Sequence, residues 1–289
     1  MIKKVNVFGA GTMGRGIAHV AALSGYEVIM KDVSLEILNN AVEIIRRNLQ
    51  KGIELGKLDN KAMNEALDRI SLETDVEKGA EEADLIFEAI IEKIDTKLDL
   101  FRKLDSICKE ATIFASNTSA LSVTELAGAT SRADRFVGTH FFNPAHIMRL
   151  VEVVKGLETS SLTIDKIAEV IKKMGKDAVI VNDSPGFATS RINVMIGNEA
   201  FYMLQEGVAS AKDIDKALKL GLNHPMGPFE LIDLVGLDIR LSVLKDLHSR
   251  LGEKFRPCPL LEKYVKAGRL GRKVGRGVYE YENTKIKKI

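Results

Sequence analysis

Three polar segments near the middle of the chain hold residue types that can exchange protons with a bound molecule. Ser-Asn-Thr-Ser at residues 116–119 follows one apolar run, and His-Phe-Phe-Asn-Pro at residues 140–144 follows another. The third is a single acidic residue, Glu152, inside the apolar run 150–154. Histidine is the usual group for proton exchange, because its ordinary pKa lies near neutral pH. We therefore predict that His140 is a general acid or base.

Glu152 is the expected partner of His140. A carboxylate within an apolar strand is costly unless it is paired, and paired with His140 it would fix the ring tautomer and stabilise the imidazolium. Other interpretations stay open: a histidine after a strand often has only a structural role, and Glu152 could face solvent on an edge strand. Ser-Asn-Thr-Ser is also common in turns and helix caps. The segments favour catalysis only in combination with a cofactor-binding fold.

A glycine-rich turn supplies that combination. Residues 9–14, Gly-Ala-Gly-Thr-Met-Gly, match the G-x-G-x-x-G pattern, with a strand expected before them, a helix after them and a second strand that ends in Asp32. Gly9 permits the tight turn, Gly11 lets a pyrophosphate approach the backbone, and Gly14 lets the helix pack closely on the strand. The helix N-terminus then faces the phosphates.

This context predicts NAD as the cofactor. Asp32 would accept hydrogen bonds from the adenosine ribose and repel a 2′-phosphate, which favours NAD over NADP, although Lys4 and Lys31 lie nearby in sequence and weaken the preference. A flavin site would leave the polar segments unexplained, and a structural turn with a surface Asp32 is the other alternative. The cofactor-binding residues predicted from the motif are Gly9, Ala10, Gly11, Thr12, Met13, Gly14 and Asp32.

The two sets of residues fit one reaction. Ligands of open α/β sheets bind beyond the carboxyl ends of the strands, where the polar segments are expected. Oxidation of an alcohol by NAD removes a hydride, and His140 would take the hydroxyl proton. Ser119 and Asn143 would donate hydrogen bonds to the substrate oxygen or to the nicotinamide amide.

Short apolar runs alternate with helical periodicity as far as residue 181. Strands are predicted at 5–8, 27–31, 70–72, 85–90, 113–115, 135–138, 150–154 and 179–181, and helices at 13–24, 35–50, 93–109 and 164–174. The charged stretch 51–69 resembles two further helices with a solvated face. The alternation predicts an α/β fold, a mostly parallel sheet with helices on both faces, in an N-terminal Rossmann-type dinucleotide-binding domain.

The pattern changes after residue 181. Asp-Ser-Pro-Gly at 183–186 indicates a turn and a helix start, and 187–206 is a long apolar helical segment. Helices separated by Gly and Pro continue to about residue 266, and a strand is expected only at 277–281. We therefore predict two domains: 1–183, which binds NAD, and 184–289, which is all-helical.

The composition argues against other classes of protein. The 289 residues carry a net charge of +2, with 6% aromatic residues and no tryptophan, so a nucleic-acid partner is not expected. No apolar run approaches the length of a membrane span, and residues 2–8 are typical of a first strand rather than a signal peptide. Cys108 and Cys258 are far apart, which fits a reducing cytosol. We expect a cytoplasmic protein with a small-molecule partner and no metal, since no histidine has metal-ligand spacing.

The order of the motifs resembles the 3-hydroxyacyl-CoA dehydrogenase family, and especially its short bacterial and archaeal 3-hydroxybutyryl-CoA dehydrogenase members. The resemblance runs nearly end to end, and its motifs are long and specific. They are VFGAGTMGRGIAHVAA at 7–22, FASNTSAL at 114–121, RFVGTHFFNPAHIMRLVEVV at 135–154, DSPGF at 183–187, LGLNHPMGPFELIDLVGLD at 220–238 and GRKVGRGVYEY at 271–281.

The resemblance implies an NAD-dependent, reversible oxidation of an (S)-3-hydroxyacyl-CoA to the 3-oxoacyl-CoA, as in the β-oxidation of fatty acids. It implies that the helical domain covers the cleft and forms a homodimer. The roles that it implies are His140 as catalytic acid or base, Glu152 as its partner, Ser119 as a substrate contact, Asn143 near the nicotinamide and the reacting oxygen, and Glu92, Lys97 and Lys273 along the NAD site.

Two positions depart from the family pattern. The family often has Asn four residues after the Gly of its Pro-Gly-Phe motif, where the side chain helps to hold the substrate carbonyl. This chain has Ser190 there, with a shorter reach, and we keep it as a catalytic-site residue. Asn193, one helical turn further on, could compensate. His146 stands where a Pro is common and leaves a second imidazole near the cleft without a role.

Two other functions remain open. One is oxidation of a small free 3-hydroxy acid, although such enzymes tend to use a lysine in place of the His140–Glu152 pair. The other is a non-catalytic dinucleotide-binding protein, which would need only the glycine turn. Basic residues on and after the predicted helix 35–50 either contact the phosphates of coenzyme A or form a solvated face; they are Arg46, Arg47, Lys51 and Lys57.

Overall fold

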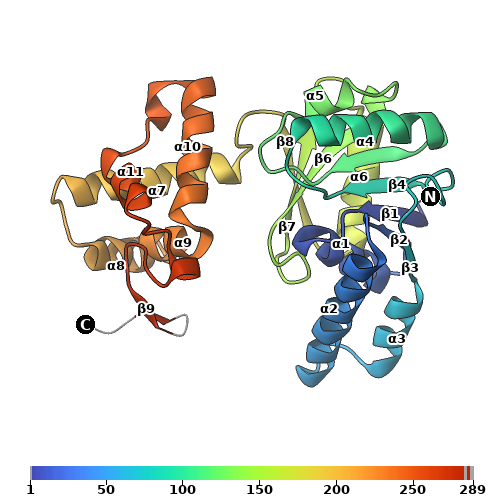
Figure 1. Cartoon of the computed structure of the whole chain (residues 1–289), viewed down its shortest axis with the longest axis horizontal. Helices are drawn as coiled ribbons and strands as arrows, with labels where there is room; N and C mark the ends of the chain where they lie inside the picture. The colour runs from blue at the N-terminus through green and yellow to red at the C-terminus, as the bar shows by residue number, and fades with distance from the viewer. Residues whose placement is uncertain (1, 283–284, 287–289) are drawn as a thin grey trace. The chain divides into compact units, whose positions relative to one another are not determined.

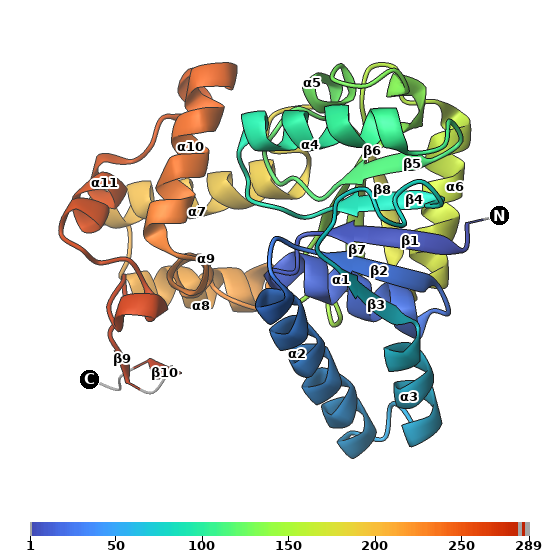
Figure 2. The same cartoon turned by 45° about the vertical axis from the view of Figure 1, so that its right-hand side comes forward.

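The computed structural model describes residues 2–282 and 285–286 (Figures 1 and 2). The chain forms two compact units, Met1–Ser184 and Pro185–Ile289. The predicted domains 1–183 and 184–289 include residues 1, 283–284 and 287–289, which lie outside the described residues.

An eight-stranded sheet forms the centre of the first unit (Figure 2). Its order is β3-β2-β1-β4-β5-β6-β7-β8, and every neighbouring pair is parallel except β6 and β7. The strands are β1 (Lys4–Phe8), β2 (Glu27–Lys31), β3 (Ile70–Glu73), β4 (Leu85–Glu88), β5 (Ile113–Ser116), β6 (Phe136–Phe141), β7 (Leu150–Lys155) and β8 (Asp177–Asn182). This mostly parallel sheet confirms the predicted Rossmann-type α/β fold.

Helices cover both faces of the sheet. They are α1 (Thr12–Leu23), α2 (Leu35–Glu54), α3 (Asn60–Asp68), α4 (Ile94–Ile107), α5 (Val123–Ala127) and α6 (Ser161–Lys173), with a 3-10 turn, η1 (Ala133–Arg135). Apolar side chains of α1, α2 and α6 share one core with alternate strand residues such as Ile113. The next residue, Phe114, points to the opposite face because side chains alternate along a strand. There its ring lies 5.7 Å from that of Phe101 on α4.

The stretch 51–69 holds one new helix, so the prediction of two was wrong. Helix α2 continues to Glu54, and the chain turns away from it at Gly56, which has a φ of +67°. Helix α3 then begins after Asp59, whose side chain accepts a hydrogen bond from Ala62 N at 2.7 Å. Helices α2 and α3 lie side by side and project from the sheet (Figures 1 and 2).

Strand β6 is longer than predicted and contains His140. The expected strand, 135–138, placed this residue after the strand, but β6 continues to Phe141. It does so because its pairing with β7 extends through His140, opposite Glu152, and Phe141, opposite Val151.

The second unit is a group of helices. They are α7 (Thr189–Gln205), α8 (Ala211–Gly221), α9 (Pro228–Val235), α10 (Leu237–Leu251) and α11 (Pro259–Lys266), with 3-10 turns η2 (Glu253–Phe255) and η3 (Arg272–Val274). Their core includes Phe201 and Phe229, whose ring centroids are 5.3 Å apart. A short pair, β9 (Tyr281–Glu282) with β10 (Lys285–Ile286), follows the helices.

The predicted strand 277–281 is mostly irregular, and only its last residue belongs to β9. The physical reason is the carboxylate of Asp233, which accepts hydrogen bonds from Val278 N and Tyr279 N at 2.8 and 2.9 Å. These backbone groups therefore pair with a side chain and not with a neighbouring strand.

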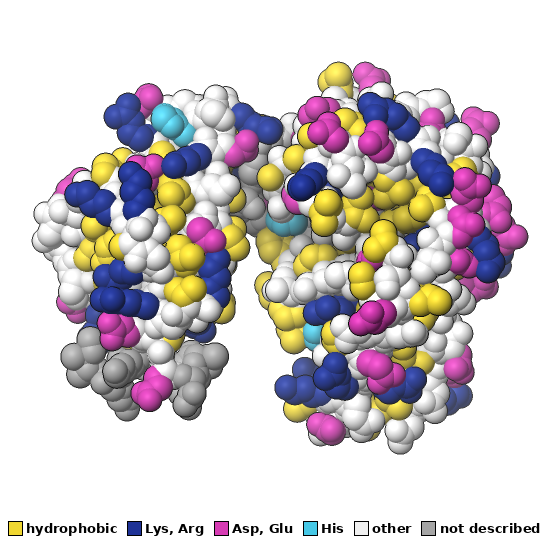
Figure 3. All heavy atoms as spheres, viewed as in Figure 1, with side chains coloured by type: hydrophobic (Ala, Val, Ile, Leu, Met, Phe, Trp, Pro, Cys, Tyr) yellow, Lys and Arg dark blue, Asp and Glu magenta, His cyan; other side chains and the backbone are white. Residues whose placement is uncertain are grey.

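Acidic and basic side chains are interspersed on the face of each unit that Figure 3 shows, in keeping with the small net charge. Across the described residues, the helices lack the combination of length and apolar character that a membrane crossing requires.

Candidate active site

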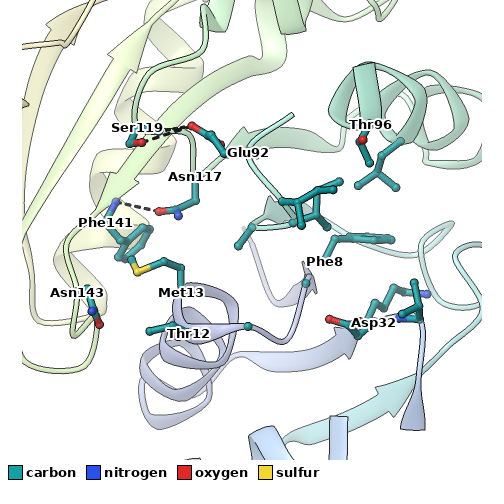
Figure 4. Close-up of a pocket in the computed structure, with 18 of the residues that line it drawn as sticks. Phe8, Thr12, Met13, Asp32, Glu92, Thr96, Asn117, Ser119, Phe141 and Asn143 are labelled. Carbon is teal, nitrogen blue, oxygen red and sulfur yellow. Dashed lines mark hydrogen bonds between the residues drawn. The ribbon is translucent and has the colours of Figure 1, made fainter. Parts of the chain in front are cut away.

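A cavity of about 890 Å³ opens in the first unit where several parallel strands end (Figure 4). Its walls come from the ends of β1, β2, β4, β5 and β6 and from the start of α1. The volume is in the range of small-molecule and cofactor sites. The described part of the chain thus brings the glycine turn and the polar segments to one place.

The glycines of the turn have separate roles. A Cβ on Gly9, which has a φ of +95°, would lie 2.4 Å from Ala89 O, and one on Gly14 would lie 1.7 Å from Gly9 O. Both glycines therefore allow the turn, helix α1 and β4 to pack closely. A Cβ on Gly11 would meet no atom within 4 Å, so this glycine leaves open space at the N-terminus of α1. A pyrophosphate needs that approach, and the turn fits a dinucleotide.

Asp32 is held at the rim of the cavity. Its Oδ2 accepts a hydrogen bond from Ala10 N at 2.7 Å, and its Oδ1 accepts one from Val33 N at 2.7 Å. In Figure 4 Asp32 lies on one side of the cavity, and Ser119 and Asn143 lie on the other. This separation suits a cofactor with its adenosine end at Asp32 and its nicotinamide end at the polar segments.

Lys31, beside Asp32, is a cavity residue that sequence reasoning did not assign to the site. Its side chain is 2% exposed, and Nζ donates to the carbonyls of Asp75, Val76 and Lys78 at 2.6, 3.3 and 2.7 Å. An ammonium has three donors, and these carbonyls engage all of them. Val76 also lines the cavity, so Lys31 holds part of the wall in place. Burial lowers the pKa of Lys31.

The two lysines that weakened the preference for NAD are therefore engaged elsewhere. Lys31 Nζ is occupied by backbone carbonyls, and Lys4 forms an ion pair with Glu82. Lys31 could have been identified from the sequence by the rule that identified Glu152. A charged side chain within an apolar strand requires partners.

His140 and Glu152 meet inside the protein. They are opposite each other on the antiparallel strands β6 and β7, and His140 Nδ1 lies 2.8 Å from Glu152 Oε2. Glu152 is fully buried, whereas His140 is 8% exposed and lines the cavity. An ionised carboxylate only accepts hydrogen bonds, so this contact would orient the ring with Nδ1 as the donor and leave Nε2 as the other ring nitrogen.

Glu92 lies in the cavity wall and fixes the Ser-Asn-Thr-Ser segment. Its Oε1 accepts a hydrogen bond from Thr118 Oγ1 at 2.6 Å. It also accepts one from Ser119 N at 2.8 Å, and Figure 4 shows Ser119 beside Glu92. Burial raises the pKa of Glu92, but the ammonium of Lys97 and these hydrogen bonds outweigh it and hold the pKa below its usual value. Glu92 is therefore ionised at neutral pH and keeps Ser119 at the cavity.

Lys97 lies behind Glu92 and not at the cavity surface. It is fully buried, and Nζ lies 2.6 Å from Glu88 Oε1 and 3.1 Å from Glu92 Oε2. Glu88, also fully buried, accepts a further hydrogen bond from Ser116 Oγ at 2.5 Å. Sequence reasoning missed Glu88, although it too is a carboxylate in an apolar strand.

Asn117 joins the ends of the two strands that carry the polar segments. Its Oδ1 accepts a hydrogen bond from Phe141 N at 3.0 Å (Figure 4). Asn143 lines the cavity and precedes Pro144 through a cis peptide bond.

The remaining predicted residues lie in the second unit. Ser190 is in the first turn of α7. Lys273 Nζ contacts both carboxylate oxygens of Asp238 at 2.6 Å. With its amide oriented to satisfy hydrogen bonding, Asn193 accepts from two guanidinium nitrogens of Arg240 at 2.8 and 3.2 Å. Asn193 therefore already has a partner within its own unit.

Hydride transfer to a nicotinamide needs an acid–base group beside the cofactor, and the cavity of the first unit combines a dinucleotide-type glycine turn with a histidine in its wall. The class of protein that this fold and cavity define is a nicotinamide-dependent dehydrogenase. Residues 4–184 match the family described as "3-hydroxyacyl-CoA dehydrogenase, NAD binding domain", and residues 186–281 match "3-hydroxyacyl-CoA dehydrogenase, C-terminal domain". The chain belongs to the 3-hydroxyacyl-CoA dehydrogenase family, and it is an oxidoreductase that uses NAD.

Individual relatives are similar over nearly their whole length. The chain is 48% identical to a probable 3-hydroxybutyryl-CoA dehydrogenase of Bacillus subtilis, over 97% of this chain and 98% of that protein. It is 45% identical to a 3-hydroxybutyryl-CoA dehydrogenase of Bradyrhizobium diazoefficiens, over 99% and 97%. The crystal structure of an (S)-3-hydroxybutyryl-CoA dehydrogenase from Ralstonia eutropha matches with a TM-score of 0.95 and 43% identity, over 98% of this chain and 100% of that one.

Proposed function

We propose that this protein catalyses the reversible, NAD-dependent oxidation of an (S)-3-hydroxyacyl-CoA to the 3-oxoacyl-CoA, with 3-hydroxybutyryl-CoA as its substrate. The observation that carries the proposal is the contact of 2.8 Å between His140 Nδ1 and the buried carboxylate of Glu152, at the wall of a dinucleotide cavity. The names of its relatives support the acyl group and the coenzyme A carrier.

Acid–base chemistry at His140 accounts for the proton. When bound, NAD accepts the hydride from C3 in oxidation, and NADH returns it in reduction. In oxidation His140 Nε2 accepts the proton of the 3-hydroxyl group, so that the C3–O bond becomes a carbonyl. In reduction the protonated ring gives this proton back to the oxygen. Glu152 holds the ring and stabilises its charged form.

The other site residues divide between the cofactor and the substrate. Residues 9–14 hold the pyrophosphate and Asp32 holds the adenosine ribose. Ser119 and Asn143 donate hydrogen bonds near the reacting oxygen and the nicotinamide, and Ser190 supports the carbonyl. Glu92 lies along the NAD site, with Lys97 behind it, and the family resemblance assigns Lys273 to the same site.

Each domain has a role in this proposal. Domain 1–183 binds NAD, and domain 184–289 covers the substrate cleft and forms a homodimer. Sedimentation velocity at micromolar concentration tests the assembly, and a single species of monomer mass would contradict it. The enzyme acts in the cytoplasm, in fatty acid metabolism, as in β-oxidation.

The direct test of the activity is consumption of NADH with acetoacetyl-CoA, compared with longer 3-oxoacyl-CoA substrates and with free acetoacetate. We expect rapid turnover with acetoacetyl-CoA and little with the free acid. Equal rates with free acetoacetate would support the free 3-hydroxy acid alternative. No turnover with any of these substrates, in protein that still binds NADH, would support a non-catalytic dinucleotide-binding protein.

A further inference from the structure

A second pair of histidines, His19 and His146, lies outside the catalytic pair. His19 of α1 is 4% exposed and stacks on His146, with ring centroids 5.2 Å apart and an angle of 11° between the rings. Lys176, 7% exposed, donates Nζ to Met148 O at 2.7 Å. The proposed reaction uses none of these side chains, although burying His19 and Lys176 beside a half-buried His146 is costly.

His146 belongs to the segment 142–149, which follows β6 and carries Asn143 into the cavity wall. Two of the segment's contacts are with α1. Ala145 is buried. It packs so closely on Gly16 of α1 that a Cβ added to Gly16 would lie 2.8 Å from the Cβ of Ala145. One helical turn further along α1, His19 stacks on His146.

The same helix begins at the cavity, where Thr12 and Met13 line the wall. The Ala145–Gly16 contact and the histidine stack therefore connect two walls of one cavity, the start of α1 and Asn143. Of the two contacts, only the stack can change with pH.

We propose that His19 and His146 are positioning residues, whose stack fastens the segment 142–149 to α1 and so holds Asn143 at the cavity, and that acid releases this segment. The proposal rests on the proposed function in one respect, namely that Asn143 contacts the nicotinamide end of the cofactor. The stack itself is a property of the fold, and it can be tested without any turnover.

The charges around the stack favour neutral rings. Lys176 faces both histidines, and the neighbouring Arg149 and Asp177 form an exposed ion pair of 2.9 Å with each other. Among the described residues, no carboxylate lies within ion-pair distance of either ring. Burial, then His146 and then Lys176 lower the pKa of His19 to about 4, and burial followed by Lys176 lowers the pKa of His146.

These lowered pKa values fix the direction of the effect. Above pH 6.5 a released His19 is as neutral as a packed one, so its titration does not disturb the stack. Below pH 6.5 the released ring binds a proton that the packed ring resists, and the packed form loses stability as the pH falls. From pKa values of about 4 and 6.5, His19 alone shifts the balance towards release by about tenfold at pH 5.5.

Hydrogen exchange of the full-length protein without cofactor tests the release. The amides of Ile147 and Met148 both donate to Pro144 O at 2.9 Å and report on the segment. We expect their protection factors, corrected for intrinsic exchange, to fall at least about tenfold between pH 7.5 and pH 5.5, because His146 adds to the effect of His19. His146→Phe keeps a stacked ring that cannot titrate and makes His19 the only titrating member, so a smaller fall is expected. The double variant His19→Gln,His146→Phe should abolish the fall in protection.

His224→Phe, in the second unit, makes the same change away from the segment and should behave as the wild type. Equal falls in protection in the wild type and the double variant would overturn the proposal. If the double variant does not fold, His146→Ala provides a second test: it should lower the protection of both amides already at pH 7.5, and unchanged protection would overturn the proposal.

NADH affinity tests the positioning role separately. We expect the dissociation constant of NADH to rise several-fold in His146→Ala at pH 7.5 and to remain unchanged in His224→Phe. Loss of amide protection without a change in NADH affinity would overturn the positioning role. Because neither measurement requires turnover, a failure of the proposed reaction would not be mistaken for a failure of this inference.

Discussion

Replacing Glu152 with Gln tests the central contact of the site with the least change of shape. The substitution keeps the side chain in the interior of β7 but removes the negative charge that lies 2.8 Å from His140 Nδ1. Both side chains are buried, so water screens their interaction only weakly. A hydrogen bond to a charged group contributes about 1.5–3 kcal/mol. Since this charge matters most when the imidazolium forms, kcat should fall by roughly 10- to 150-fold.

Steady-state reduction of acetoacetyl-CoA by NADH measures this effect. His140→Gln should lower kcat by about 10²–10⁴-fold, the usual contribution of a general acid or base. The double variant should be scarcely worse than His140→Gln alone, because both substitutions disable one unit. NADH affinity should stay close to the wild-type value in all three proteins.

Asp105→Asn is a matched control in the same unit. Asp105 Oδ1 accepts a hydrogen bond from the buried Arg132 Nε at 2.6 Å, and it does not line the cavity. This variant should lose thermal stability and keep its kcat. If Glu152→Gln retained a kcat within about twofold of the wild type, or if the effects of the two single substitutions multiplied, the reasoning would be refuted.

Three further predictions concern the cofactor end of the cavity. Gly14→Ala places a Cβ 1.7 Å from Gly9 O, so the turn must move and NADH affinity, measured by calorimetry, should fall more than tenfold; a folded variant with normal affinity would contradict this. Lys31→Met leaves three backbone carbonyls without their hydrogen-bond donor. Each buried carbonyl that stays unsatisfied destabilises the fold by about 1–3 kcal/mol. The substitution should raise the KM for NADH about tenfold or more at nearly unchanged kcat, whereas Lys78→Met, which removes only a surface ion pair, should not. The wild type should have a higher kcat/KM with NADH than with NADPH, and Asp32→Asn should reduce this difference. Equal kcat/KM values for the two cofactors in the wild type would contradict the proposal that Asp32 selects NAD.

Local patterns predicted the elements well, because their causes are local. The strand, glycine turn and helix around residues 5–24 follow from side-chain alternation, from the space that glycine leaves and from helical spacing. The end of α2 was predicted too early because a helix stops where its backbone turns, here at Gly56, and not where its apolar face fades. The irregular stretch before Tyr281 depends on Asp233, which is 48 residues away in sequence.

For the site, one rule was applied to too few residues. The cost of burying a charge identified Glu152 and predicted that it meets His140, as the structure places them. The same rule applies to Glu88 and Lys31, which also stand in apolar strands, and following it would have indicated two more buried networks. Their partners could not be named from the sequence, because Lys97 and the carbonyls of residues 75–78 reach them only through the fold.

The sequence by itself determined the class of fold, the glycine turn with Asp32 and the NAD cofactor, because each depends on residue types at short and fixed spacing. It also indicated the family, through a resemblance of motifs along nearly the whole chain. Only the tertiary structure decided which side chains face the cavity and which stand behind it. It placed Lys31 and Lys97 as supports, set His140 opposite Glu152 through the register of β6 and β7, and stacked His19 on His146. These contacts join different strands, helices and loops, and their geometry depends on how strands pair and helices pack, which no local pattern encodes.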